Sequence, residues 1–93
     1  MPTLHIEHPI TDFETWSSAF ARFEEARTQA GVTSHRVQRP IDDPKYVVID
    51  LEFETDEQAR NFLGFLKNKV WGNAANSPAL AGEPQTLILQ PAS

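Results

Sequence analysis

The segment Tyr46–Glu54 constrains the fold more than any other part of the chain. Its second half alternates, with Leu51 and Phe53 apolar and the residues beside them acidic. Strict alternation is typical of a strand with one buried face. Its first half, residues 46–49, is apolar at every position, which is typical of a strand covered on both sides. We therefore predict a central strand, one end of which is covered on its second face by something outside the chain's own helices.

Two longer segments repeat apolar residues at helical spacing. The first begins near Thr11, continues to Ala30, and is followed by Gly31, a residue suited to ending a helix in the left-handed conformation. The second begins at Thr55 and ends at Gly72. Each start has a threonine followed three residues later by Glu or Gln, which predicts a capping box at the helix N-terminus.

Residues 3–8, 32–39 and 86–90 are short, contain alternating or apolar runs, and are bounded by proline or glycine. The resulting order is strand, helix, strand, strand, helix, strand. This order predicts an α+β protein of the ferredoxin-like βαββαβ type, with a four-stranded antiparallel sheet and both helices on one face. With 93 residues, the chain is predicted to form one domain over residues 1–93.

Composition excludes several function classes. The net charge of −5 argues against nucleic-acid binding, and the absence of cysteine excludes disulfides and thiolate metal sites. No apolar run approaches the ~18 residues that a membrane span requires. We therefore expect a soluble, cytoplasmic protein with neither a nucleic-acid nor a membrane partner.

Two helices cover only one face of a four-stranded sheet, so the other face needs a separate explanation. If Leu51 and Phe53 face the helices, then His5, Tyr46, Val48 and Asp50 face away. The apolar members of this open face indicate an interface rather than a solvated surface. The simplest closure is a twofold homodimer, sheet against sheet, in which these four residues contact the partner.

The chain resembles the dimeric α+β barrel superfamily, especially small proteins similar to antibiotic-biosynthesis monooxygenases. The resemblance covers nearly the whole chain and is carried by His8, Ile10, Asp12, Phe13 and Trp16, then Phe20, Arg27, Ala30-Gly31-Val32, Arg39, Asp42-Asp43-Pro44, Glu52-Phe53, Ala59, Phe62 and Ser77-Pro78-Ala79-Leu80. It implies a homodimer, a dimeric α+β barrel with a pocket between helices and sheet in each subunit. Relatives include cofactor-free oxygenases of aromatic polyketides, haem-degrading enzymes and isomerases. Their oxygenases place Asn and Trp with His or Arg around the substrate, whereas no Asn lies on the first strand here.

The three histidines are the first candidates for chemistry because their pKa lies nearest neutrality. His5 and His8 are an odd number of residues apart on a strand and point to opposite faces, so no metal site is predicted. His8 shares the helix-facing side and is the candidate catalytic acid or base. The alternative is a partly exposed His8 whose ring is satisfied by backbone at the strand end. His35, on the weak edge strand, is a candidate ligand-binding residue or, alternatively, a solvated one.

Aromatic residues supply the remaining candidate site. Trp16, Phe20, Phe62 and Trp71 lie on or near the two predicted helices and are predicted to bind the ligand, although Phe20 and Phe62 also suit a plain packing role. The long loop Gly72–Pro84 follows Trp71 and is a candidate gate.

Two functions remain open from the sequence. The first is a homodimer that binds a small apolar or aromatic metabolite without a cofactor, as a cofactor-independent monooxygenase or isomerase. The second is a non-catalytic dimerisation or binding module with a fully packed barrel. A cavity on which polar groups converge favours the first, and a filled interface between helices and sheet favours the second.

Overall fold

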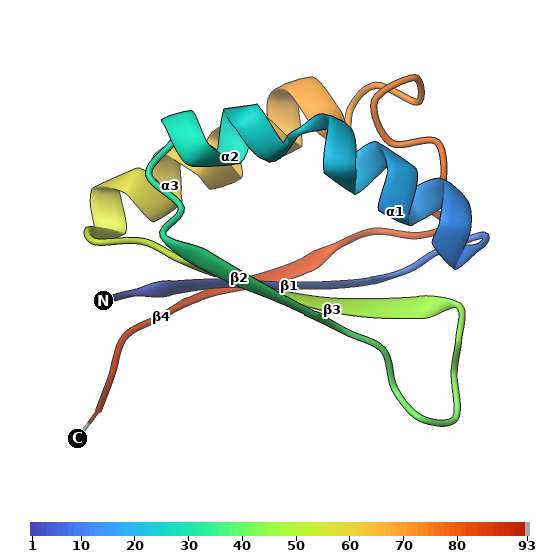
Figure 1. Cartoon of the computed structure of the whole chain (residues 1–93), viewed down its shortest axis with the longest axis horizontal. Helices are drawn as coiled ribbons and strands as arrows, with labels where there is room; N and C mark the ends of the chain where they lie inside the picture. Colours follow the sequence, from blue (N-terminus) through green and yellow to red (C-terminus); the bar gives the residue numbers. More distant parts are fainter. Residues whose placement is uncertain (93) are drawn as a thin grey trace.

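The four strands form one antiparallel sheet in the order β2-β3-β1-β4 (Figure 1). The computed structural model describes residues 1–92. The strands are β1 (Thr3–Pro9), β2 (Ser34–Gln38), β3 (Tyr46–Glu52) and β4 (Gln85–Leu89). The first and third strands are central and the second and fourth are edges, which confirms the ferredoxin-like prediction.

All helices lie on one face of this sheet, and no helix covers the other face (Figure 1). They are α1 (Phe13–Arg22), α2 (Glu24–Gln29), α3 (Asp56–Phe65) and a π-helical turn, η1 (Leu66–Val70). The first predicted helix is therefore two helices with a break at Phe23, where the backbone N–H donates to Phe20 O at 3.2 Å instead of continuing the α-helical pattern. In η1 the Trp71 N–H reaches back five residues to Leu66 O at 2.7 Å.

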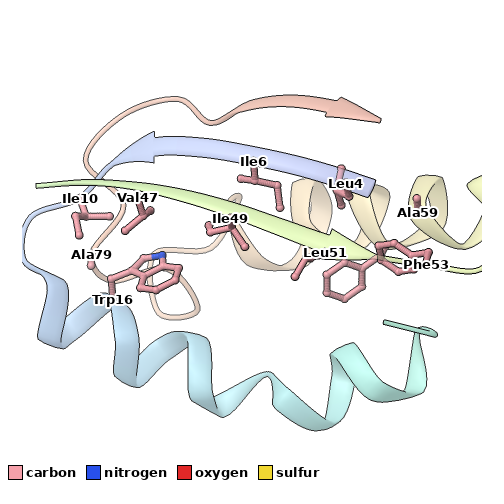
Figure 2. Packing of buried hydrophobic residues seen from close by; sticks show 11 residues of the cluster. Leu4, Ile6, Ile10, Trp16, Val47, Ile49, Leu51, Phe53, Ala59 and Ala79 are labelled. Carbon is pink, nitrogen blue, oxygen red and sulfur yellow. The ribbon is translucent and has the colours of Figure 1, made fainter. Parts of the chain in front are cut away.

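Alternate residues of the two central strands form the core between the sheet and the helices (Figure 2). Leu4 and Ile6 of β1 face the same side as Val47, Ile49 and Leu51 of β3, and all five are buried. The antiparallel register pairs Leu4 with Leu51 and Ile6 with Ile49, so this face is continuous across the two strands. Because side chains alternate, the residues between them lie on the open face.

The N-terminus of α1 differs from the prediction. Thr11 is not the cap: its N–H donates to Ala79 O at 2.9 Å, and the extended residue before the helix is Asp12. Asp12 caps the helix instead, accepting from the Thr15 N–H at 3.1 Å and the Thr15 hydroxyl at 2.8 Å. The predicted capping box at Thr11 is therefore wrong, because a long-range backbone bond delays the helix by one residue.

The capping box predicted at the second helix is confirmed. Thr55 accepts from the Gln58 N–H, and the Gln58 side chain accepts from the Thr55 N–H, each at 3.2 Å. The Gln58 side chain also lies where a Cβ at Gly31 would stand, 2.6 Å from its Nε2. Gly31 has φ +99, so the predicted left-handed glycine is confirmed and is further required by this close approach.

The two candidate caps can be separated by substitution. Asp12→Ala is expected to lower the free energy of unfolding by about 0.5–2 kcal/mol, because the first-turn N–H of Thr15 loses its acceptor. Thr11→Ala is the matched control and should change it by less than about 0.5 kcal/mol. Urea denaturation followed by circular dichroism measures both. A larger loss for Thr11→Ala than for Asp12→Ala would contradict the capping assignment.

The loop before β4 is attached to the end of β1. Ala81 N–H donates to Pro9 O at 3.2 Å, Thr11 N–H to Ala79 O, and Ile10 forms a bridge with Leu80. Ala79 is itself part of the core. These contacts fix residues 79–81, so a gating movement of the kind expected for this loop is confined to the part before them.

Candidate functional site

A cavity of about 80 Å³ lies between the helices and the sheet. Its floor is made by Ile6, Ile49 and Leu51 of the central strands, and its walls come from the helices and from the loop after η1. Four of the predicted ligand-binding residues line it, joined by one aromatic side chain that was not predicted. The aromatic lining is Trp16, Phe20, Phe23, Phe62 and Trp71.

The aromatic wall is built by the helical spacing of α1. Trp16 and Phe20 are four residues apart, so they lie one above the other, and their rings stack with centroids 4.9 Å apart at 22°. Trp16 is buried below the start of β3, near Val47 (Figure 2). Phe62, from α3, closes the wall near Phe53, with ring centroids 6.0 Å apart.

His8 is the predicted catalytic residue, and its side chain reaches the cavity lining. It is only 3% exposed, because it lies on the helix-facing side at the end of β1. Its Nδ1 lies 2.9 Å from Pro9 O. A carbonyl oxygen only accepts, so Nδ1 carries the proton and Nε2 keeps a lone pair. Burial lowers the pKa of His8, partly opposed by the Pro9 hydrogen bond, so the ring is neutral at pH 7.

The position of His8 therefore has features of both interpretations, the catalytic acid or base and the ring satisfied by backbone. The ring is satisfied by backbone, as the packing interpretation expects, but it is buried rather than partly exposed. The hydrogen bond uses only one of the two ring nitrogens. The other is an acceptor in an apolar environment, which is the arrangement that a general base needs.

His35 does not join this site. It is exposed on β2 and contacts Phe20 edge-on, with ring centroids 5.5 Å apart. It lines not the cavity but a second depression, whose other lining residues come from all four strands: Thr3, Ser34, Arg36, Asp50, Glu52 and Leu89. The edge position of β2 separates it from His8, so the structure does not bring the two histidines together.

Arg27 is a cavity residue that the sequence did not single out as a candidate. It belongs to α2 and is only 6% exposed. Its Nη1 donates to Phe20 O at 2.6 Å, and its guanidinium carbon lies 3.6 Å from the centroid of the Phe20 ring. Burial lowers the pKa of Arg27, opposed by the charge of Glu24, but a guanidinium stays protonated at neutral pH. The available signal was its position seven residues after Phe20 and four after Phe23, on the apolar stripe.

The loop contributes two further polar side chains that the sequence did not select, Asn76 and Ser77. Asn76 donates from Nδ2 to Lys69 O at 2.6 Å, and Ser77 donates to Asn73 O at 3.1 Å. Both bonds hold the turn that follows η1. An asparagine amide thus reaches the cavity from the loop rather than from the first strand.

The four predicted interface residues lie together on the open face of the sheet. His5 is 2.7 Å from Asp50 through Nδ1 and 2.9 Å from Glu7 through Nε2, and the Tyr46 hydroxyl donates to Glu7 at 2.7 Å. These hydrogen bonds, the one to Glu7 most and then the one to Asp50, raise the pKa of His5. The centre of the face is therefore a network of polar side chains, with Val48 beside it.

The most exposed apolar surface on this face comes from β4. Leu87 and Leu89 are 60% and 43% exposed and pair with His5 and Thr3 of β1. Alternation places them on the side away from the helices, because Ile88 between them packs against the core. The open face thus has a polar centre and an apolar edge.

Within residues 1–92 no group of three or more His, Asp or Glu side chains is placed to hold a metal ion. His5 and His8 lie on opposite faces of β1, as predicted from their spacing. No helix in the described chain is long and apolar enough to cross a membrane.

The fold is shared with solved structures, although neither a protein-family model nor a curated protein sequence matches the chain. A candidate antibiotic biosynthesis monooxygenase from Bordetella bronchiseptica superposes with a TM-score of 0.71 at 14% identity, covering 99% of this chain and 98% of that one. SnoaB, a cofactor-independent oxygenase from Streptomyces nogalater, gives 0.67 at 18% identity, covering 97% and 93%. A dimeric ferredoxin-like protein from an uncultured marine organism gives 0.65 at 9% identity, covering 100% and 96%.

These similarities extend over the whole chain at low identity, so they establish the fold and not the chemistry. They agree with the strand order, with the single helical layer and with the resemblance found in the sequence. The chain therefore has the ferredoxin-like α+β fold of these structures, several of which are described as antibiotic biosynthesis monooxygenases.

Proposed function

We propose that the chain is a homodimer that binds a small apolar, aromatic metabolite in the helix–sheet cavity and moves a proton on it without a cofactor. The observation that carries this proposal is the state of His8: buried, neutral, with Nδ1 bonded to Pro9 O and Nε2 left as an acceptor in an aromatic-walled cavity. Perturbed titratable groups in apolar cavities are the usual mark of acid–base chemistry.

The proposed reaction starts with proton abstraction. His8 Nε2 takes a proton from an acidic O–H or C–H group of the ligand, and the electron pair of the broken bond stays on the ligand as a phenolate or enolate. In an isomerase the proton returns to another carbon. In a cofactor-independent oxygenase, the class named for the neighbour SnoaB, the anion instead gives its electrons to O₂. A carbon–oxygen bond forms, and the resulting peroxide anion takes the proton back from His8 to give a hydroperoxide. The apolar walls exclude water from the anion in both cases.

The cavity limits the size of this ligand. Its volume of about 80 Å³ is smaller than the about 150 Å³ of an apolar cavity known to admit benzene. A one-ring ligand therefore requires a lining side chain to move. Trp71 and the adjacent loop segment are suited to that movement, because Trp71 is only partly buried and the loop is attached to β1 only from residue 79 onward.

The same small volume supports the second candidate, a non-catalytic dimerisation or binding module with a filled barrel. In that case the aromatic residues serve packing, and His8 is held by Pro9 O alone. The two candidates differ in whether any small molecule enters the cavity.

Filling the cavity tests the first candidate. Ala19→Leu adds three carbon atoms at a buried cavity position on α1, so binding of aromatic ketones or quinols should be lost while the fold is kept. Ala21→Leu makes the same change on the exposed side of α1 and should leave binding intact. Quenching of tryptophan fluorescence by a library of such compounds measures binding. An absence of quenching in the unmodified protein would favour the filled module.

The homodimer is tested separately by charging the open face. Leu87→Asp places a carboxylate on the apolar edge formed with Leu89, beside the acidic residues Glu7 and Asp50. We expect sedimentation to show a dimer for the unmodified protein and a monomer for this variant, because an unpaired charge is costly to bury in an interface. Ser18→Asp, on the exposed side of α1, should remain dimeric. A monomeric unmodified protein at micromolar concentration would refute the proposed dimer.

A further inference from the structure

Arg27 is a buried cation that lacks an anionic partner. No Asp or Glu oxygen lies within 4.0 Å of its guanidinium in the chain from residue 1 to 92, although three other ion pairs occur there. The nearest attraction is from Glu24, which acts on the charge without forming an ion pair. Buried charges in proteins are normally paired, because an uncompensated one is expensive to remove from water.

The contacts that Arg27 does make satisfy only part of its hydrogen-bonding capacity. A guanidinium has five N–H donors, and Arg27 uses Nη1 toward Phe20 O. The Phe20 ring below it supplies a weaker cation–π attraction. Neither Nε nor Nη2 has a hydrogen-bond partner within the described residues. No fully buried side-chain nitrogen there is left unsatisfied, so these two atoms must keep accessible surface.

Arg27 is also a lining residue of the cavity. It shares this lining with Trp16, Phe20 and His8, and only 6% of the residue is exposed. An accessible guanidinium edge in an apolar cavity can donate hydrogen bonds to two oxygens of one oxyanion at once. The cavity therefore combines apolar walls, a cation without an anionic partner and the neutral acceptor His8.

We infer that the ligand of this cavity is an organic anion: its oxyanion pairs with the Arg27 guanidinium while its apolar body lies against Trp16 and Phe20. This inference rests on the proposed function and narrows the ligand class to aryl or short apolar carboxylates, phenolates and enolates. Two sources of the anion fit the same chemistry. The ligand arrives as a carboxylate, or His8 removes a proton and Arg27 stabilises the phenolate or enolate that forms.

An alternative role for Arg27 is structural. Its bond to Phe20 O lies at the break between α1 and α2, where the helix leaves that carbonyl short of its usual partner. A structural clamp would make Arg27 important for stability and indifferent to the charge of a ligand. The two roles therefore separate when neutral and anionic ligands of the same shape are compared.

The test uses the full chain with three one-ring probes: benzoate, its neutral counterpart benzamide, and 4-nitrophenol, whose anion absorbs visible light. The variants are Arg27→Met, which keeps the length and removes the charge, and Arg22→Met as the matched control at an exposed position of α1. Binding is followed by tryptophan fluorescence and by the shift of the thermal unfolding midpoint.

We expect Arg27→Met to bind benzoate about 10- to 100-fold more weakly than the unmodified protein, as for the loss of a charged hydrogen bond. Benzamide binding should change by less than about threefold, and Arg22→Met should bind both probes normally. The pKa of bound 4-nitrophenol should be about one unit or more higher in Arg27→Met than in the unmodified protein. Strong benzoate binding identifies a ligand that arrives ionised, and the 4-nitrophenol effect alone identifies an anion formed in the site.

Three outcomes would overturn the inference in distinguishable ways. Equal affinity for benzoate and benzamide in the unmodified protein, unaffected by Arg27→Met, refutes the anion and leaves the proposed cavity ligand intact. Binding of no probe, benzamide included, refutes both. If Arg27→Met does not fold, Arg27→Lys keeps the charge but loses the fork of two donors. Arg27→Lys should then weaken the binding of benzoate more than that of benzamide. An equal loss of affinity for both probes would show that Arg27 has only a structural role.

Discussion

Phe53→Ala is expected to lower the free energy of unfolding by about 3–5 kcal/mol. Phe53 follows β3, has no exposed surface, and packs its ring against Phe62 of α3. Its removal leaves a cavity where sheet and helix meet, and the surrounding side chains cannot fully collapse into it. Since a domain of this size is stable by only about 5–15 kcal/mol, this one change removes a large share of the total.

Urea denaturation measures this loss directly, and the thermal midpoint should fall by about 4–8 °C per kcal/mol. Ile41→Ala is the control, because Ile41 is completely exposed in the turn between β2 and β3 and loses no buried contact. A loss below about 1 kcal/mol for Phe53→Ala would show that the junction of β3 and α3 repacks easily.

His8→Asn is expected to reduce proton transfer in the cavity by about 10²- to 10⁴-fold. The asparagine amide can still donate to Pro9 O in place of Nδ1, so the strand end keeps its hydrogen bond while the acceptor Nε2 is removed. The rate of ligand-dependent O₂ consumption, or of exchange of the ligand's acidic hydrogen with solvent, measures the effect. Ligand binding itself should be nearly unchanged.

The lowered pKa of His8 also predicts how the free energy of unfolding changes with pH, and His8→Asn tests it. Burial lowers the pKa of folded His8 below its ordinary value of 6.5, so the unfolded chain binds the proton more readily than the folded one. The stability that neutral His8 contributes is therefore present above pH 6.5 and lost as the pH falls through the lowered pKa. His8→Asn should remove this acid-side loss, and the reaction rate of the unmodified protein should fall over the same range. An unchanged acid limb in the variant would assign the pH dependence to another group.

The strands could be predicted from the sequence because their side chains repeat every second residue. Leu51 and Phe53, alternating with acidic residues, determined which face of β3 is buried, and the structure confirms it. Three details of the helices could not be predicted. The break at Phe23 and the π-helical turn before Trp71 depend on hydrogen bonds that local spacing does not specify, and the cap at Asp12 depends on a bond between Thr11 and Ala79, 68 positions later.

The candidate site was predictable where it follows helical spacing and unpredictable where it does not. Trp16, Phe20 and Phe62 were expected at a helix–sheet boundary and line the cavity, although ligand binding by them stays a prediction. Arg27 was not selected, because a charge at a stripe position usually extends to solvent. His35 was selected, but the edge strand places it outside the cavity.

The sequence by itself determined the element order, the burial of one face of β3 and the opposite orientations of His5 and His8, because these depend on periods of two and 3.6 residues within short segments. Only the tertiary structure decided which groups meet. The residues that line the cavity come from several elements, including β1, α1, α2, η1 and the loop before β4. Long-range packing therefore decides that His8, Arg27 and Asn76 line the same cavity. Whether a side chain's charge is compensated depends on its neighbours in space, and the periodicity of a short sequence segment does not specify these neighbours.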